Sequence, residues 1–459
     1  MIYVILVVIY VVCGLMILQT TGIKRLLIFY MGILYVPGSL SIIPQSMLMG
    51  HFFYLSMFIL SMIRFHEFNA KNFQSCPLFI PLLIVFISYF LIGLFDERVS
   101  KSLAIYRSIR EFLGTYFLFF VGWTSLESED REYSHIGVIP GVGADYSKFF
   151  KHLIPITVLM TVYGFVTFFF KTNPVLDAVG LQDRFFNELD SSFRAFRVTA
   201  MCVSSSVYGM LCGVIFLCGA FFIENKNKIQ IAALILLFIN VFMSATRAAM
   251  IPFIIGLLIF IILNKGITGF LRNILLTIII VLLIYPLLPS SLSFFVTGVF
   301  DSILDSILPG GSGGAAYRGS NLDAREMQIG AAFQLLKENP WFGHGFGYAG
   351  EVLLRGNSHK QLLGMESYLC FIGIERGLVN LFAEVWFYIS CVIYFFRHRS
   401  IDKLYADMGI SLIAFFIPFL IFAWVNGCWF FFMPVLGYIT KAIFLSENTL
   451  PKSELVKFH

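Results

Sequence analysis

The sequence predicts an all-α polytopic membrane protein, and three observations lead to this class. The mean hydropathy of the 459 residues is +0.85, 58% of them are hydrophobic and only 13% are charged. A soluble chain of this length needs far more polar residues at its surface. Apolar runs of about 20 residues, the length that crosses a bilayer as a helix, recur along most of the chain. The first run lacks a basic leader and a small-residue cleavage site, so we expect it to be retained.

These apolar runs are assigned to about 12–13 spanning helices. Turns rich in Lys and Arg are expected on the cytoplasmic side, by the positive-inside rule. Such turns contain Lys24, Arg25, Arg64, Lys71, Lys226, Lys228, Lys265, Arg272, Arg397, Arg399 and Lys403. With these turns inside, the two long connections 171–201 and 289–367 lie on the outer face. The expected spans are 2–20, 26–43, 49–63, 78–95, 108–124, 152–170, 202–223, 229–245, 248–264, 270–288, 368–396, 407–425 and 427–445.

The predicted topology also defines the sections of the chain. Spanning helices fill both ends and the middle, and the two outer loops separate them. The sections are spanning helices in 1–170, a first outer loop in 171–201, central spans in 202–288, a large outer loop in 289–367, C-terminal spans in 368–445 and a cytoplasmic tail in 446–459.

The large outer loop is expected to contain an amphipathic helix over 323–338, "DAREMQIGAAFQLLKE". Asp323 followed by Glu326 is a variant of the capping box, and the Asn-Pro pair after Glu338 ends the helix. Such a helix rests at the outer membrane surface or under the loop. A Gly/Ser-rich hinge at 308–320 precedes it and is typical of a gating segment or a plain linker. The expected apolar residues are Met327, Ile329, Ala332, Phe333, Leu335 and Leu336.

The predicted outer face carries more basic residues than the positive-inside rule allows, with 15 of the 32 in the chain and 11 of those arginine. Arginine binds phosphate through a planar, bidentate fork. An arginine-lined outer cavity therefore indicates a lipid-linked phosphate or pyrophosphate, and the alternative is pairing with loop carboxylates or lipid headgroups. The residues are Arg98, Lys101, Arg107, Arg110, Lys171, Arg184, Arg194, Arg197, Arg247, Arg318, Arg325, Lys337, Arg355, Lys360 and Arg376.

Arg247 is the most specific of these candidates, because apolar segments lie on both sides of it in "NVFMSATRAAMIPFII". A charge inside membrane-embedded sequence is costly and indicates a functional site. The alternative is an arginine whose side chain extends to the membrane interface. Arg194 and Arg197 stand just before the next span, on the same predicted side.

Acid–base candidates lie close to the start of a later span, in "GMESYLCFIGIERG". Glu366 begins this span, where a carboxylate is protonated, paired or catalytic, and a structural contact with an arginine is the alternative. His344 and His359 are candidate general bases or loop histidines without a role. Gly373 and Gly377 have the spacing of a close helix-packing motif. The eight cysteines form no CxxC pair and the histidines no ligand spacing, so we expect no disulfide framework and no metal.

The stretch "NPWFGHGFGY" (339–348) alternates glycine with aromatic residues and a histidine. No GK[ST] follows it and no strand precedes it, which excludes a P-loop and a dinucleotide-binding turn. The glycines are expected to let the backbone turn sharply and approach a bulky ligand closely.

Several of these features, taken in order, resemble a known family. They are Arg197 before a span, "SATR" ending at Arg247, a loop helix starting at Arg325, "NPWFGHGFG", and "ESYLCFIGIERGL" at the next span. This order resembles the C-terminal half of the O-antigen polymerase and O-antigen ligase superfamily, which comprises multi-span glycosyltransferases of the bacterial inner membrane. The similar region covers about 195–445.

The resemblance implies a GT-C-like helical fold and a glycan carried on undecaprenyl pyrophosphate. It implies transfer to an acceptor at the periplasmic face, without a nucleotide sugar, cofactor or nucleic acid, and allows for a chain-length regulator as partner. Ligases of the family show His-Asn where this chain has Met365-Glu366. We therefore favour a polymerase of O-antigen or a related surface polysaccharide over a ligase acting on lipid A-core. A lipid-linked oligosaccharide flippase or transporter is the alternative of another class.

The resemblance also implies roles for individual residues. Arg197, Arg247 and Arg325 would hold the pyrophosphate, with Arg194 as a rival to Arg197. Ala200 and Ser205 replace the family's glycine and proline after the first arginine. Glu366, or otherwise His359, would take the acceptor proton. The expected substrate-loop residues are Gly343, His344, Gly345, Gly347, Tyr368 and Arg376.

Overall fold

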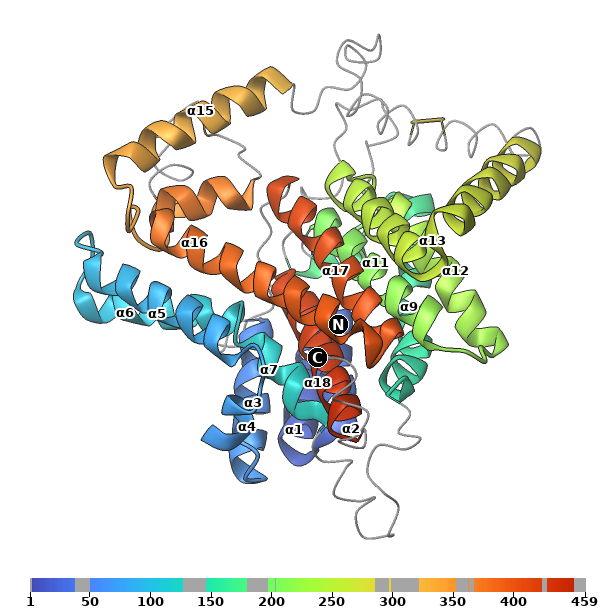
Figure 1. Cartoon of the computed structure of the whole chain (residues 1–459), viewed down its shortest axis with the longest axis horizontal. Coiled ribbons are helices and arrows are strands. Elements are labelled where there is room, and N and C mark those ends of the chain that lie inside the picture. The colour runs from blue at the N-terminus through green and yellow to red at the C-terminus, as the bar shows by residue number, and fades with distance from the viewer. Residues whose placement is uncertain are drawn as a thin grey trace. The chain divides into compact units, whose positions relative to one another are not determined.

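The computed structural model confirms the all-α class. It describes residues 2–37, 50–126, 146–179, 197–202, 204–284, 297–298, 322–351, 362, 367–422 and 427–449. All regular elements in these ranges are helices (Figure 1). The chain forms two compact units. Unit 1 comprises Met1–Phe149, Leu322–Gly409 and Leu420–His459, and unit 2 comprises Phe150–Asn321 and Ile410–Phe419.

Unit 1 combines the N-terminal helices with the segments that follow the large loop. α18 crosses α7 at very close range, because a Cβ on Gly122 would lie 1.8 Å from the carbonyl oxygen of Pro434. α5 packs against both α6 and α16, and α15 runs beside the first part of α16 (Figure 1). The helices are α1 (Ile2–Gln19), α2 (Gly22–Tyr35), α3 (His51–Arg64), α4 (Ala70–Gln74), α5 (Phe79–Phe95), α6 (Lys101–Gly114), α7 (Leu118–Trp123), η1 (Thr124–Leu126), α15 (Leu322–Glu338), α16 (Tyr368–Arg397), η6 (His398–Ser400) and α18 (Trp429–Thr449).

Unit 2 is built around α11, most of whose residues are buried. The Tyr208 hydroxyl on α11 donates to the Asn240 side chain on α12 at 2.8 Å, and Asn240 donates to the Thr161 carbonyl on α9 at 3.3 Å. These bonds satisfy polar groups inside an apolar bundle. The helices are α9 (Lys148–Phe170), α10 (Pro174–Ala178), α11 (Ser205–Phe222), α12 (Lys228–Met243), α13 (Arg247–Ile284) and the middle of α17 (Lys403–Phe422).

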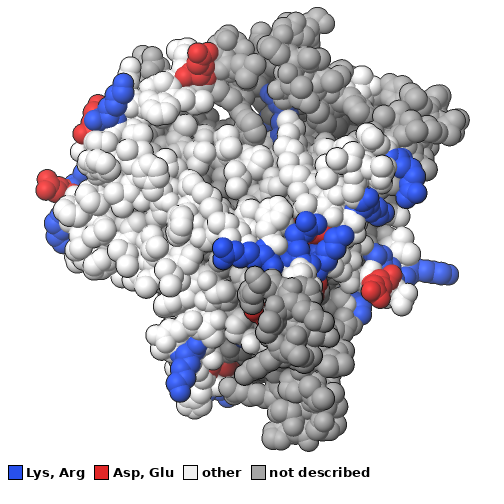
Figure 2. All heavy atoms as spheres, viewed as in Figure 1, with Lys and Arg blue, Asp and Glu red and all other residues white. Residues whose placement is uncertain are grey.

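Within the described residues, seven helices are long and apolar enough to cross a membrane, and they identify a multi-pass membrane protein. Many large apolar side chains on α1, α5, α9 and α16 are exposed, as expected for contact with lipid. Most of the described surface visible in Figure 2 is neither acidic nor basic. The seven are Ile2–Gln19, Lys148–Phe170, Ser205–Phe222, Arg247–Arg272, Tyr368–Ser400, Lys403–Ile421 and Trp429–Asn448, and shorter apolar helices are His51–Arg64, Phe79–Phe95 and Lys228–Met243.

One predicted span is wrong. The expected span 108–124 is divided between α6 and α7 by a turn at 115–117. α6 is a polar helix, and its Arg107 side chain pairs with Glu351 of the large loop. The expected separation of spans 248–264 and 270–288 is supported, because two helices meet within α13 at a kink at Gly266, whose φ of 70° and ψ of 175° are not helical. The kink directly follows Lys265, one of the basic residues expected in the turn between these spans.

The predicted loop helix is confirmed as α15, which ends at Glu338 just before Asn339-Pro340. Its apolar face is confirmed in part. Ala332 and Leu335 are buried against Phe371 and Ile374 of α16, whereas Phe333 is exposed. Met327 and Ile329 are exposed as well. The predicted hinge at 308–320 lies outside the described residues.

Candidate functional site

α16 is broken at Gly377, whose φ of 67° and ψ of −169° are not helical. A break of this kind leaves carbonyl oxygens without partners at the end of the first half, which is costly in an apolar environment. The segment 339–351, called here the inserted loop, supplies the missing donors. The backbone amide of His344 donates to the Ile374 carbonyl, and that of Gly345 donates to the Glu375 carbonyl, both at 2.8 Å.

The second half of α16 begins with amides that also lack helical partners. The amide of Leu378 donates to the carbonyl of Pro340 at 2.8 Å, and the amide of Val379 donates to the carbonyl of Trp341 at 3.1 Å. The inserted loop therefore bonds to both sides of the break through its backbone. This arrangement explains why an irregular segment follows α15 directly.

The glycines of the inserted loop adopt the turn conformation expected from the sequence. Gly343, Gly345 and Gly347 have φ values of 65°, 86° and 84°, in the region that favours glycine. The expectation that Gly373 and Gly377 form a helical packing face is wrong, because Gly377 is the break itself. The inserted loop approaches the backbone of α16 closely. The expected close approach of its glycines to a ligand stays a prediction.

Two of the predicted outer-face arginines hold the inserted loop against α5 and α6. Arg98 donates to the Phe346 carbonyl at 3.1 Å and pairs with Asp96 at 3.0 Å. Arg107 donates to the same carbonyl at 3.2 Å and binds Glu351 through both terminal nitrogens, at 3.1 and 2.7 Å. Arg98 and Arg107 therefore pair with groups of the protein, which was the alternative to binding a phosphate.

Arg376 lies in a buried polar network and is only 6% exposed. Its Nη1 donates to Glu384 at 3.0 Å, to the Tyr368 hydroxyl at 2.9 Å and to the Tyr89 hydroxyl. Its guanidinium also lies over the rings of Tyr89, Phe346 and Tyr368. The predicted substrate-loop residues Tyr368 and Arg376 are thus together, inside unit 1 rather than at its surface.

Glu384 and Tyr89 are members of this network that the sequence analysis missed. Glu384 is 2% exposed and accepts a hydrogen bond from Tyr89 at 3.1 Å. A carboxylate inside an apolar run, eight positions after Arg376, was the available signal, since a buried charge requires a partner.

Both ring nitrogens of His344 are hydrogen-bonded. Nδ1 lies 3.2 Å from the Asn339 amide nitrogen, which only donates, so Nδ1 is the acceptor. Nε2 then carries the hydrogen and donates to the Leu335 carbonyl at 3.0 Å. The ring also stacks on Tyr348 at a centroid distance of 4.5 Å. Burial, and next the nearby Glu338 carboxylate, raise the pKa of the Tyr348 phenol, which therefore stays neutral.

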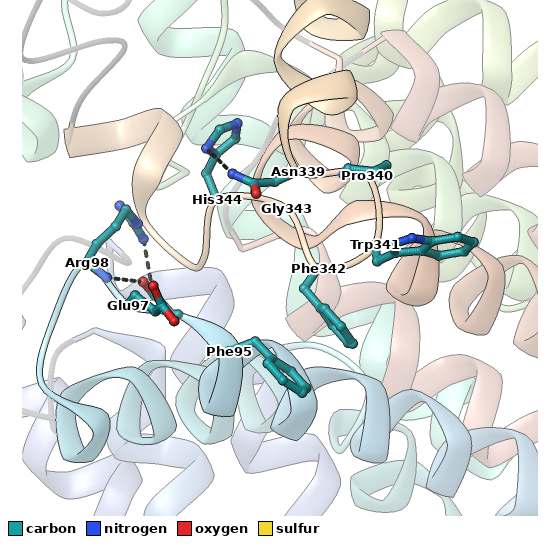
Figure 3. Close-up of a pocket in the computed structure, with 10 residues that line it drawn as sticks. Phe95, Glu97, Arg98, Asn339, Pro340, Trp341, Phe342, Gly343 and His344 are labelled. Atoms are coloured by element: carbon teal, nitrogen blue, oxygen red, sulfur yellow. Dashed lines mark hydrogen bonds and ion pairs between the residues drawn. The ribbon is translucent and has the colours of Figure 1, made fainter.

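A pocket of about 380 Å³ opens between the end of α5 and the inserted loop (Figure 3). The rings of Phe95 and Phe342 stack at 4.2 Å on one side of it, and the Arg98 and Glu97 side chains lie on the other. Among the described residues, no three His, Cys, Asp or Glu side chains are grouped to hold a metal ion. The lining residues are Phe95, Asp96, Glu97, Arg98, Asn339, Pro340, Trp341, Phe342, Gly343 and His344.

In unit 2 the structure brings the segments of Arg197 and Arg247 together. The amide of Val198 donates to the carbonyl of Met243 at 3.2 Å, which joins the residue after Arg197 to the end of α12. Arg247 is the first residue of α13, four positions beyond Met243. Both arginines are half-buried. The segments that carry the two arginines therefore meet, and the predicted pyrophosphate contacts stay a prediction.

Strained backbone accompanies this junction. Ala200 and Ala245 are fully buried and have φ values of 45° and 50°, in the left-handed region that L-residues rarely adopt. Asn173 holds the first of them, because its Nδ2 donates to the Ala200 carbonyl at 2.8 Å and to the Thr199 hydroxyl at 3.1 Å. Such strain concentrates at functional sites, where surrounding bonds maintain it.

Several predicted site residues fall outside the part of the chain that the structure describes. They are Arg194, His359 and Glu366. Arg325 belongs to α15, but its side chain is outside the described part as well. The roles of these four residues are therefore predictions from the sequence.

The apolar helices contain buried charge pairs and a loop inserted in a broken spanning helix. These features define a polytopic membrane protein with a polar site in its interior. Residues 232–383 match the family described as "O-Antigen ligase". The match places this segment in the O-antigen polymerase and ligase superfamily, confirms the resemblance, and identifies a membrane enzyme of glycan processing. It does not distinguish polymerases from ligases. A comparison with curated proteins found no match.

Proposed function

We propose that this protein is a glycosyltransferase of the bacterial inner membrane. It polymerises oligosaccharide repeat units carried on undecaprenyl pyrophosphate, at the periplasmic face, into O-antigen or a related surface polysaccharide. The match of residues 232–383 to a glycan-transferring family carries the proposal. That segment contains Arg247, α15, the inserted loop and the break in α16.

The donor pyrophosphate is assigned to the Arg197–Arg247 junction. Arg247 opens α13, where the helix dipole also favours an anion. Arginine guanidinium groups placed there would stabilise the negative charge that develops on undecaprenyl pyrophosphate as it leaves. Arg194 and Arg325 are proposed for the same role from their sequence positions.

The acceptor hydroxyl attacks the anomeric carbon of the donor glycan, and the bond from that carbon to the pyrophosphate oxygen breaks. The growing chain is thereby transferred to the next lipid-linked repeat. Glu366 is proposed to take the hydroxyl proton, with His359 as the alternative. The leaving group is already an activated pyrophosphate, so the chemistry does not require a metal. His344 is less suited to this role, because both of its ring nitrogens are bonded.

A ligase is the second candidate, and the description of the matching family favours it. A ligase would transfer a finished chain to lipid A-core instead of to another repeat. The residues at the donor site would serve both reactions, since both release undecaprenyl pyrophosphate. Met365-Glu366 in place of the ligases' His-Asn is the observation that favours the polymerase.

The direct test uses the purified chain in detergent with a short synthetic repeat linked to undecaprenyl pyrophosphate, without metal or nucleotide. A ladder of products with released undecaprenyl pyrophosphate is expected from a polymerase. A single transfer that requires added lipid A-core would establish a ligase. No transfer to either acceptor would contradict both and favour the transporter.

A further inference from the structure

We propose that the pocket between α5 and the inserted loop, called here the α5 pocket, binds an uncharged sugar of the acceptor glycan. This inference rests on the proposed function and assigns to that function a saccharide subsite. The pocket is formed within unit 1 by residues 95–98 at the end of α5 and by residues 339–344. Its volume of about 380 Å³ lies within the range of about 300–1,000 Å³ typical of small-molecule sites.

The charge of the pocket argues against a phosphate ligand. Asp96 and Glu97 contribute two carboxylates and Arg98 contributes one guanidinium, which leaves one net negative charge. Arg98 is already bonded to Asp96 and to the Phe346 carbonyl. A pyrophosphate would therefore be repelled by the carboxylates of this pocket, because the guanidinium of Arg98 is already bonded to protein groups. A neutral sugar would not be repelled.

The Glu97 carboxylate is the available acceptor in this pocket. Glu97 is exposed, and it forms no ion pair or hydrogen bond with any residue that the structure describes. An ionised carboxylate accepts several hydrogen bonds from hydroxyl groups. The sugar hydroxyls that line one edge of a pyranose ring are donors of this kind.

Trp341 supplies the apolar surface and one donor. Its side chain is 62% exposed, and its indole N–H has no hydrogen-bond partner among the described residues. A sugar presents an apolar C–H face and a polar rim, and the Trp341 indole and the Glu97 carboxylate, on opposite sides of the pocket, match the two. Figure 3 shows Trp341, Phe342 and Phe95 along one side of the pocket and Glu97 with Arg98 on the other.

Backbone hydrogen bonds hold one wall of the pocket in place. The carbonyls of Pro340 and Trp341 accept hydrogen bonds from the amides of Leu378 and Val379 across the α16 break. The backbone that carries Trp341 is thus tied to a spanning helix, and a preformed site loses less conformational entropy on binding.

The competing explanation is that Trp341 contacts membrane lipid, as interfacial tryptophans often do. Photo-crosslinking separates the two. Benzoylphenylalanine is placed at position 341 of the full chain in cells that make the polysaccharide, and the irradiated peptides are analysed by mass spectrometry. Trp386, which is 51% exposed on the second half of α16, is the matched control position. Sugar adducts at 341 and acyl-chain adducts alone at 386 are expected, and acyl-chain adducts alone at 341 would overturn the proposal.

Steady-state kinetics with the synthetic lipid-linked repeat give the second test. Trp341→Ala and Glu97→Gln are each expected to raise the acceptor KM about tenfold with kcat within about twofold, equivalent to about 1.4 kcal/mol of lost binding. Glu224→Gln, an exposed carboxylate before α12, is the control and leaves KM unchanged.

The outcomes distinguish the subsite from the function. If the wild-type chain is active and both pocket variants have an unchanged KM, the subsite is contradicted and the proposed glycosyltransferase function is not. Sugar adducts at 341 in a chain that transfers nothing support the subsite and contradict the proposed function. Melting curves of both variants establish that they fold.

Discussion

Gly343 and Gly377 meet backbone to backbone at the break in α16. A Cβ on Gly377 would lie 2.6 Å from the amide nitrogen of Gly343, and a Cβ on Gly343 would lie 2.5 Å from the amide nitrogen of Arg376. Both residues have positive φ, at 65° and 67°. The inserted loop and the broken helix are therefore one structural element, which positions the α5 pocket and the Arg376 network together.

We expect Gly377→Ala and Gly343→Ala each to lower the free energy of unfolding by about 2–5 kcal/mol. The left-handed conformation accounts for about 1–2 kcal/mol and the backbone clash for about 1–3 kcal/mol. Thermal unfolding in detergent measures the effect. Gly330→Ala in α15 is the control, because a Cβ added there would have no other atom within 4 Å and a helical alanine stabilises by about 0.5–1 kcal/mol. Equal melting temperatures for the three variants would contradict the backbone contact.

We expect the Arg376–Glu384 pair to be essential to stability. Arg376→Gln or Glu384→Gln alone leaves a buried charge unpaired, which costs about 3–5 kcal/mol. The double variant Arg376→Gln with Glu384→Gln should cost less than the sum of the two single variants, and this double-mutant cycle measures the difference. Arg107→Gln breaks a more exposed pair and should cost about 0–1 kcal/mol. Strict additivity would argue against the pair.

We expect Arg247→Ala to lower the transfer rate by about 100–1,000-fold without unfolding the protein, because one donor to the developing charge is lost. Arg247→Lys should recover little, since lysine lacks the bidentate fork. The lipid-linked repeat assay measures both. Lys228→Ala, an exposed cation at the start of α12, serves as the control. Full activity of a folded Arg247→Ala variant would contradict the assignment of the donor site.

We expect Ala200→Gly to stabilise the chain by up to about 1 kcal/mol, because glycine adopts φ of 45° without strain. Ala233→Gly in α12 is the matched control and should destabilise by about 1 kcal/mol, since that residue is helical. Melting temperatures that shift in the same direction for both would contradict the strain at Ala200.

We expect His344→Gln to keep transfer activity within about threefold and to leave the pH profile of the rate unchanged. Glutamine retains a donor toward the Leu335 carbonyl, and no free ring nitrogen is lost. The pH dependence of kcat is the measurement. A folded variant with an activity loss of more than about 100-fold, the scale of general-base removal, would instead make His344 the base.

Local sequence patterns predicted α15 well, because its amphipathic period and its Asn-Pro stop lie within one segment. The same reasoning failed for 108–124, where averaged hydropathy concealed the turn at 115–117 and the polar character of α6. It also treated Gly377 as a packing residue. The break at Gly377 depends on amides and carbonyls of the inserted loop more than 30 positions earlier, and no local window contains both.

Composition and periodicity were sufficient to establish a multi-pass helical membrane protein, a helix in the large loop and glycine-dependent turns after it. These properties follow from hydropathy and backbone preference, which act over short stretches of chain. Tertiary contacts alone determined that Arg376 is paired with Glu384, that Arg98 and Arg107 hold the loop, and that the Arg197 and Arg247 segments are joined. A charge buried among apolar helices is stable only beside its partner, and the fold selects that partner from distant segments.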